Sequence, residues 1–189
     1  MMIGAEQNLI GRVFSAELLR CIADAHRGHF KDPLVQLAHA QLWVTFISIH
    51  TATFKALQGD RITDLAAIFT ASIKALMRVH LVQWKYLSCL MHLFRVNSTA
   101  ATHGLLREDG AIVLQYCFVE GAADGVLLQQ LLKTTLTFAY EFRFLSAITR
   151  DDAELPLIIQ KALDLQEDEP SIQNLGNQLL VKLNRTPHG

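Results

Sequence analysis

Charged residues, prolines and cysteines are all scarce in this chain of 189 residues. Asp, Glu, Lys and Arg make up only 19% of it and hydrophobic residues 51%. A disordered chain needs the opposite balance, so we expect most of the chain to be packed. Only four prolines occur, strand signals are nearly absent, and apolar residues recur at helical spacing almost throughout. The sequence therefore predicts a single all-α domain over residues 1–189, with about seven to nine helices.

The three cysteines, Cys21, Cys89 and Cys117, are odd in number, far apart and set in apolar surroundings. This pattern predicts buried free thiols in a reducing compartment rather than a disulfide framework. The N-terminal segment carries Glu6 and Arg12 where a secretory signal needs an apolar core. We therefore expect the protein to reside in the cytoplasm or the nucleus.

Residues 33–54 contain no Asp, Glu, Lys or Arg, and a run of that length could span a bilayer. Neither an aromatic belt nor a basic flank frames the run, however. It also contains four side chains that are costly in hydrocarbon, namely Gln36, His39, Gln41 and His50. We therefore expect a helix over 33–58, begun by Asp32-Pro33 and ended by Gly59, that is central in the protein rather than in a membrane.

Charge and motifs argue against several classes of function. The net charge of −1 lacks the basic excess of a nucleic-acid binder. The common nucleotide-binding and hydrolase motifs are missing, as is a Cys-x-x-Cys pair. The acids lie mostly in turns and in segment 151–169, which holds seven of the eighteen. Paired carboxylates for acid–base catalysis are therefore missing from the apolar helices. We expect a non-enzymatic protein with no cofactor, no metal and neither a nucleic acid nor a membrane as partner.

Residues 61–95 are helical in character and carry one narrow polar stripe. At about 100° per residue, four side chains fall within about 40° of one another: Lys74, Arg78, Lys85 and His92. The unbroken stripe favours one long helix over two helices that break near residues 79–82.

This polar stripe is the best candidate for a functional surface. Its simplest explanation is a solvated helix face. Trp84 and Met77 flank it, however, so the stripe can offer both charge and apolar anchors to an acidic protein partner. The predicted binding residues are Lys74, Arg78, Trp84, Lys85 and His92. The acidic segment 151–169 is a complementary surface, which also allows a homo-oligomer.

Further helices are predicted over 99–108, 126–149 and 155–166, and a last one is opened by Glu169-Pro170. Residues 111–119 have mixed helix and strand character, and we predict a helix there because the neighbouring segments are helical. The helix over 126–149 has one apolar stripe, formed by Leu127, Leu131, Phe138, Phe142 and Leu145. In the last helix, the apolar stripe is Ile172, Leu175, Leu179 and Leu183, and the side chains expected to face away are Gln173, Asn174, Asn177 and Gln178.

The ending EDEPSIQNLGNQLLVKLNR combines an acidic turn, a proline and an apolar stripe closed by a Leu-Leu-x-x-Leu register, and it resembles the second helix of an armadillo or HEAT repeat. The preceding LPLIIQKALDL resembles the first helix of such a repeat, so the resemblance covers residues 153–184. It implies a helical solenoid whose surface binds peptides or other subunits. We find no exact period of about 40 residues across the chain, so an irregular multi-helix bundle is the alternative fold.

Two functional hypotheses follow. The chain has more apolar helix surface than it can hide by itself, which favours a protein-binding module that acts as a subunit or scaffold of a larger complex. The alternative is a helical-bundle carrier of a small molecule, or an enzyme, with an apolar pocket around His39, His50 and Trp43.

Overall fold

The computed structural model describes residues 24–26, 28–29, 31–49, 59–150 and 154–184. Within these ranges the regular secondary structure is helical, which confirms the predicted all-α class. The helices are α3 (Pro33–Ile49), α5 (Gly59–Ala75), α6 (His80–Val96), α7 (Ser98–Arg107), α8 (Gly110–Gly121), α9 (Gly125–Phe138), α10 (Phe142–Arg150), α11 (Glu154–Asp164) and α12 (Pro170–Asn184).

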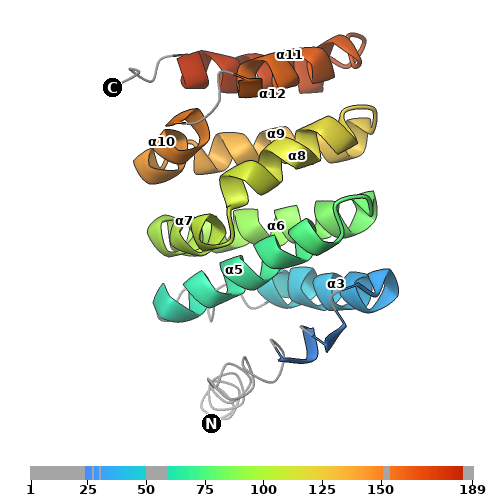
Figure 1. Ribbon diagram of the computed structural model, residues 1–189, viewed down its shortest axis with the longest axis vertical. Helices are drawn as coiled ribbons and strands as arrows, with labels where there is room; N and C mark the ends of the chain where they lie inside the picture. The colour runs from blue at the N-terminus through green and yellow to red at the C-terminus, as the bar shows by residue number, and fades with distance from the viewer. Residues whose placement is uncertain (1–23, 27, 30, 50–58, 151–153, 185–189) are drawn as a thin grey trace.

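The helices are stacked along the long axis of the molecule (Figure 1). Helices α3, α6, α9 and α12 pack on one another in that order, and we call them the second-helix layer. Helix α8 packs between α5 and α11, and these three form the first-helix layer. The two layers bury a continuous apolar core between them. This is the arrangement of a helical solenoid, one of the two architectures that the sequence predicts.

The stack has a period that the sequence did not reveal. The helices of the second-helix layer begin at Pro33, His80, Gly125 and Pro170, which are 47, 45 and 45 residues apart. Side chains at equivalent positions differ in chemistry, as at His39, Tyr86, Leu131 and Gly176. The repeat is therefore one of helix spacing and burial rather than of residue identity.

A glutamine cap recurs in three of the four helices of the second-helix layer. The fourth residue of α3, α6 and α12 is Gln36, Gln83 or Gln173, and each donates from its Nε2 to the carbonyl seven residues earlier. Those carbonyls lie in the turn before the helix, where each also accepts from the backbone N–H three residues on, so the glutamine adds a second hydrogen bond. Gln173 was predicted to face away, but it turns inward because it satisfies the carbonyls of Leu163 and Gln166.

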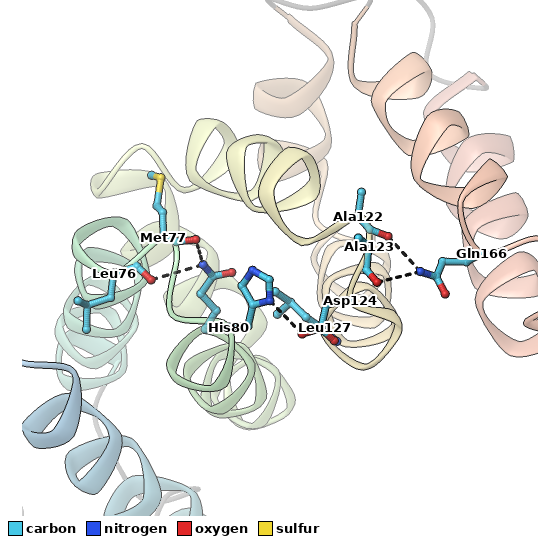
Figure 2. A network of polar contacts seen from close by, with 9 residues as sticks. Leu76, Met77, His80, Ala122, Ala123, Asp124, Leu127 and Gln166 are labelled. Atoms are coloured by element: carbon cyan, nitrogen blue, oxygen red, sulfur yellow. Dashed lines mark hydrogen bonds and ion pairs between the residues drawn. The ribbon is translucent and has the colours of Figure 1, made fainter.

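In α9 the equivalent position holds Leu128, which cannot donate a hydrogen bond. The carbonyls of the preceding turn, those of Ala122 and Ala123, are instead reached by Gln166 Nε2 from the turn after α11, at 3.3 and 3.2 Å (Figure 2). The donor thus comes from the next repeat rather than from the helix itself, and it links the two turns.

The prediction of one long helix over 61–95 is wrong. Helix α5 ends at Ala75 and α6 begins at His80. Gln83 of α6 donates from its Nε2 to the carbonyls of Leu76 and Met77 in the intervening turn. The backbone N–H of Val79 also donates to Leu76 O. The polar stripe seemed continuous because the break spans about one helical turn, which preserves the angular register.

The prediction of one helix over 126–149 is also wrong, since the chain turns at residues 139–141 between α9 and α10. Phe142, placed on the buried stripe by its spacing, is 75% exposed. Phe144 is buried in its place and its ring lies 5.7 Å from that of Phe138, which in turn lies 4.8 Å from Phe94. Aromatic packing across the turn favours the break over a continuous helix.

Helix α3 differs from its prediction in two ways. Its described part ends at Ile49, and Gly59, expected to end it, is the first residue of α5. Only one side of α3 is buried, with Trp43 in the core while Leu34 is 77% and Leu42 is 59% exposed. A helix without charges therefore has one exposed side instead of being surrounded by protein.

The predicted bounds of several helices and the predicted buried thiols are confirmed, whereas Leu175, expected on the apolar stripe of the last helix, is only half-buried. Helices α7, α8, α11 and α12 lie within a few residues of the ranges expected for them. Cys89 and Cys117 are free and buried, and burial raises the pKa of both thiols, that of Cys117 to about 12. Cys21 lies outside the described residues.

Candidate functional site

The helix break divides the predicted binding residues into two groups. Lys74, near the end of α5, forms an ion pair with Asp109 at 3.0 Å, and Arg78, in the turn, lies 3.8 Å from Glu120 of α8. Both basic side chains are therefore directed to carboxylates of the first-helix side. The five predicted residues do not form one continuous stripe.

Trp84, Lys85 and His92 all lie on α6, where the ammonium of Lys85 is 4.9 Å from the centre of the Trp84 ring. At about 100° per residue, Lys85 and His92 share one face of this helix with Leu81, Ser88 and Arg95. None of these side chains is buried. Burial, with the nearby Arg95 as a smaller cause, lowers the pKa of His92, which favours the neutral imidazole.

The same positions are solvent-accessible in every helix of the second-helix layer, and we call this set the outer stripe. Each member lies at the second, sixth, ninth, thirteenth or sixteenth position counted from the helix start, and each is exposed or half-buried. The outer stripe consists of Leu34, Ala38, Gln41 and Thr45 by α3; Leu81, Lys85, Ser88, His92 and Arg95 by α6; Val126, Gln130, Lys133, Thr137 and Tyr140 by α9; and Ser171, Leu175, Gln178 and Lys182 by α12.

Side-chain contacts join neighbouring helices along this surface. Gln130 Nε2 lies 3.1 Å from Met91 Sδ, which connects α9 to α6. Gln129 Nε2 donates to Ser171 Oγ at 2.9 Å, which connects α9 to α12. The ammonium of Lys182 lies 3.9 Å from the centre of the Tyr140 ring. These contacts connect the outer stripe from α6 through α9 to α12.

The charge of this layer has one sign. Helices α3, α6, α9 and α12 contain no Asp or Glu, and they contain four bases, namely Lys85, Arg95, Lys133 and Lys182. The first-helix layer, in contrast, carries acids in each of its helices, for example Asp64, Glu120 and Asp164. An overall charge of −1 thus conceals a separation of charge between the two layers.

Acidic residues cluster at the turns, where the helices of the second-helix layer begin. Asp124 Oδ1 accepts from the N–H of Leu127, and its Oδ2 lies 2.9 Å from His80 Nδ1 (Figure 2). The helix cap is the largest cause that lowers the pKa of Asp124, and the His80 contact adds to it. The pair connects the start of α6 to the turn before α9.

His39, the centre of the alternative pocket hypothesis, is in hydrogen-bond contact with the protein's own side chains at both ring nitrogens. His39 Nε2 accepts from the indole N–H of Trp43 at 3.3 Å, and its Nδ1 lies 3.2 Å from the hydroxyl of Tyr86. Both ring nitrogens are therefore in use, and burial lowers the pKa of the imidazole. His50, the other histidine of this hypothesis, lies outside the described residues.

Two structural features are absent from the described part of the chain. No helix there is both long and apolar enough to cross a bilayer. No cluster of three or more His, Cys, Asp or Glu side chains there has the arrangement of a metal site.

Comparisons with known proteins give no relative from which a function could be transferred. No protein-family model matches the chain, and neither a curated protein nor a solved structure shows significant similarity to it.

Proposed function

We propose that this chain is a non-enzymatic protein-binding module that acts as a subunit or scaffold of a larger complex. The observation that carries the proposal is the outer stripe, where Leu81, Val126 and Tyr140 are 53%, 70% and 72% exposed on the stacked second-helix layer. Large apolar side chains gathered on one exposed surface are typical of interaction sites, and aromatic residues are common among the energetically dominant contacts.

The repeat architecture supports the same function. A stacked array presents equivalent positions of successive helices side by side, which creates an extended surface that can follow a partner over several repeats. The spacing of 45 to 47 residues between helices falls within the range of armadillo and HEAT repeats. The sequence of 153–184 resembles such repeats, which commonly bind peptides or other subunits. Membership of either repeat family remains part of the proposal.

A peptide-display selection against the intact chain tests this function. We expect selected peptides to bind the protein and to lose at least about tenfold in affinity to the variant Leu81→Ser/Val126→Ser/Tyr140→Ser. The matched control is Ile112→Ser/Tyr116→Ser/Leu157→Ser, which removes side chains that are 52–62% exposed on α8 and α11. Circular dichroism establishes that both triple variants are folded.

Two results would overturn the proposal. One is a selection that yields no peptide with affinity above that of its scrambled sequence. The other is a set of peptides that bind the two triple variants equally well, because the outer stripe would then have no special role.

A further inference from the structure

The outer stripe also carries information about its partner's chemistry. Resting on the proposed function, we infer that the segment bound there is an acidic peptide that interleaves carboxylates with apolar side chains. Helices α3, α6, α9 and α12 contribute four bases and no acid, so the formal charge within these helices is positive although the protein as a whole is slightly negative.

The pairing of the bases differs between the two sides of the molecule. Outside the second-helix layer, Lys74, Arg78 and Arg107 are each within 4 Å of a carboxylate, those of Asp109, Glu120 and Asp64, whereas Lys161 of α11 is in none of the ion pairs among the described residues. On the second-helix layer, none of the ion pairs among the described residues involves Lys85, Arg95 or Lys133. These bases keep their capacity for a carboxylate from another molecule.

Apolar groups lie directly beside the basic ones. Lys85 is held over the Trp84 ring and Lys182 over the Tyr140 ring, at 4.9 and 3.9 Å. Leu81 and Val126 are exposed at the N-terminal end of α6 and α9, and Val181 is 48% exposed on α12. A ligand that offered only negative charge would leave these side chains in water, whereas an acidic peptide with Leu or Phe residues would cover them.

A single-stranded nucleic acid fits this surface less well. Such a ligand carries a charge at every nucleotide and is held by a dense basic groove. Here four bases are spread over three helices, and exposed acids occupy the adjoining turn at Glu167, Asp168 and Glu169. The wide spacing of these bases suits a ligand with intermittent carboxylates rather than one with a phosphate at every nucleotide.

Fluorescence anisotropy with defined probes tests the inference. The probe is a labelled peptide of about 16 residues with alternating Glu and Leu or Phe positions, compared with the same peptide carrying Gln, or Lys, at every Glu position. We expect the Glu peptide to bind at least about tenfold more tightly than the Gln peptide and to weaken with added salt. A labelled oligothymidylate of about 20 nucleotides serves as the nucleic-acid probe.

Charge reversal locates the binding surface. The variant Lys85→Glu/Lys133→Glu/Lys182→Glu should lose at least about tenfold in affinity for the Glu peptide. The matched control Lys74→Glu/Arg78→Glu/Lys161→Glu reverses the same number of charges on the first-helix side and should change the affinity by less than about threefold. An equal loss in both variants would mean a diffuse charge effect and would overturn the inference.

Three other outcomes would also overturn the inference. One is a Gln or Lys peptide that binds as well as the Glu peptide. Another is an oligothymidylate that binds more tightly than any peptide. The third is sedimentation velocity in which the chain self-associates and the Lys85, Lys133 and Lys182 reversals dissolve the dimer, since a second copy would then be the occupant. Display-selected peptides that are neutral yet need Leu81, Val126 and Tyr140 would leave the proposed function intact while this inference failed.

Discussion

His80 Nδ1 donates to Asp124 Oδ2 at 2.9 Å and so connects the start of α6 to the start of α9. Asp124 simultaneously caps α9 through the N–H of Leu127. We expect Asp124→Ala to lower the free energy of unfolding by about 1 to 2 kcal/mol, most of it from the lost cap. Urea denaturation measures this change.

A matched control separates the cap from the contact with His80. Asp32 caps α3 in the same way, by accepting from Leu34 N, and no ion pair or hydrogen bond to a histidine side chain is found for it among the described residues. Asp32→Ala should therefore cost somewhat less than Asp124→Ala. If the two costs are equal, His80 contributes nothing measurable, as is common for exposed pairs.

The glutamine caps predict a position-specific loss of stability on α12. Gln173 Nε2 satisfies the carbonyls of Leu163 and Gln166 at 2.8 and 3.2 Å. Each of these carbonyls also accepts from a backbone N–H, that of Gln166 or Glu169. Replacing Gln173 with Met keeps the length of the side chain and removes only the side-chain donor, so we expect a cost of about 0.5 to 1.5 kcal/mol in chemical denaturation. Gln178→Met, on the exposed side of α12 where Gln178 bonds only to Asn174 Oδ1, should cost less than about 0.5 kcal/mol.

Gly104 permits the close approach of α7 to α5. A Cβ at this position would overlap the carbonyl oxygen of Thr63 and lie 2.7 Å from the Cβ of Ala66. We therefore expect Gly104→Ala to destabilise the protein by about 1 to 3 kcal/mol, despite alanine's higher helix propensity. Gly59→Ala is the control, because its Cβ would meet Ala100 Cβ at an ordinary 3.8 Å, and thermal unfolding should show it to be neutral or slightly stabilising.

His39 predicts a dependence of stability on pH. The indole N–H of Trp43 donates to His39 Nε2, so a second proton on the ring would face that donor. Burial lowers the pKa of His39 below 6.5, which means that the unfolded chain binds the proton more readily. The contribution of His39 to the free energy of unfolding is fully present above about pH 6.5 and is lost as the pH falls toward the folded-state pKa. The slope from this residue is at most about 1.4 kcal/mol per pH unit.

Urea denaturation between about pH 7.5 and 5 measures this effect. His92 also has a lowered pKa and acts in the same direction, so the comparison is between wild type, His39→Gln and His92→Gln. The idea fails if His39→Gln leaves the slope of the free energy of unfolding against pH unchanged while the protein remains folded.

The candidate surface was only partly predictable. Spacing on one helix correctly grouped Lys85 with His92, because 3.6 residues per turn fix angular position. The same spacing wrongly included Lys74 and Arg78, since a turn of four residues between α5 and α6 preserves the angular register but sends the two segments in different directions. The places of Lys133, Tyr140 and Lys182 in the outer stripe could not be predicted from α6 alone. Their signal was the missing acids in four segments about 45 residues apart.

The sequence by itself determined the helical class, the helix over 98–107, the closing pair α11 and α12, and the burial of Cys89 and Cys117, because these depend on local periodicity, caps and side-chain hydrophobicity. Only the tertiary structure decided where the chain breaks at residues 76–79 and 139–141. There, Gln83 must satisfy carbonyls at the turn, and Phe144 must reach Phe138 across it. Stacking likewise brought together helices that are distant in sequence. It also left one side of α3 exposed, since burial depends on what packs against a segment and not on its composition.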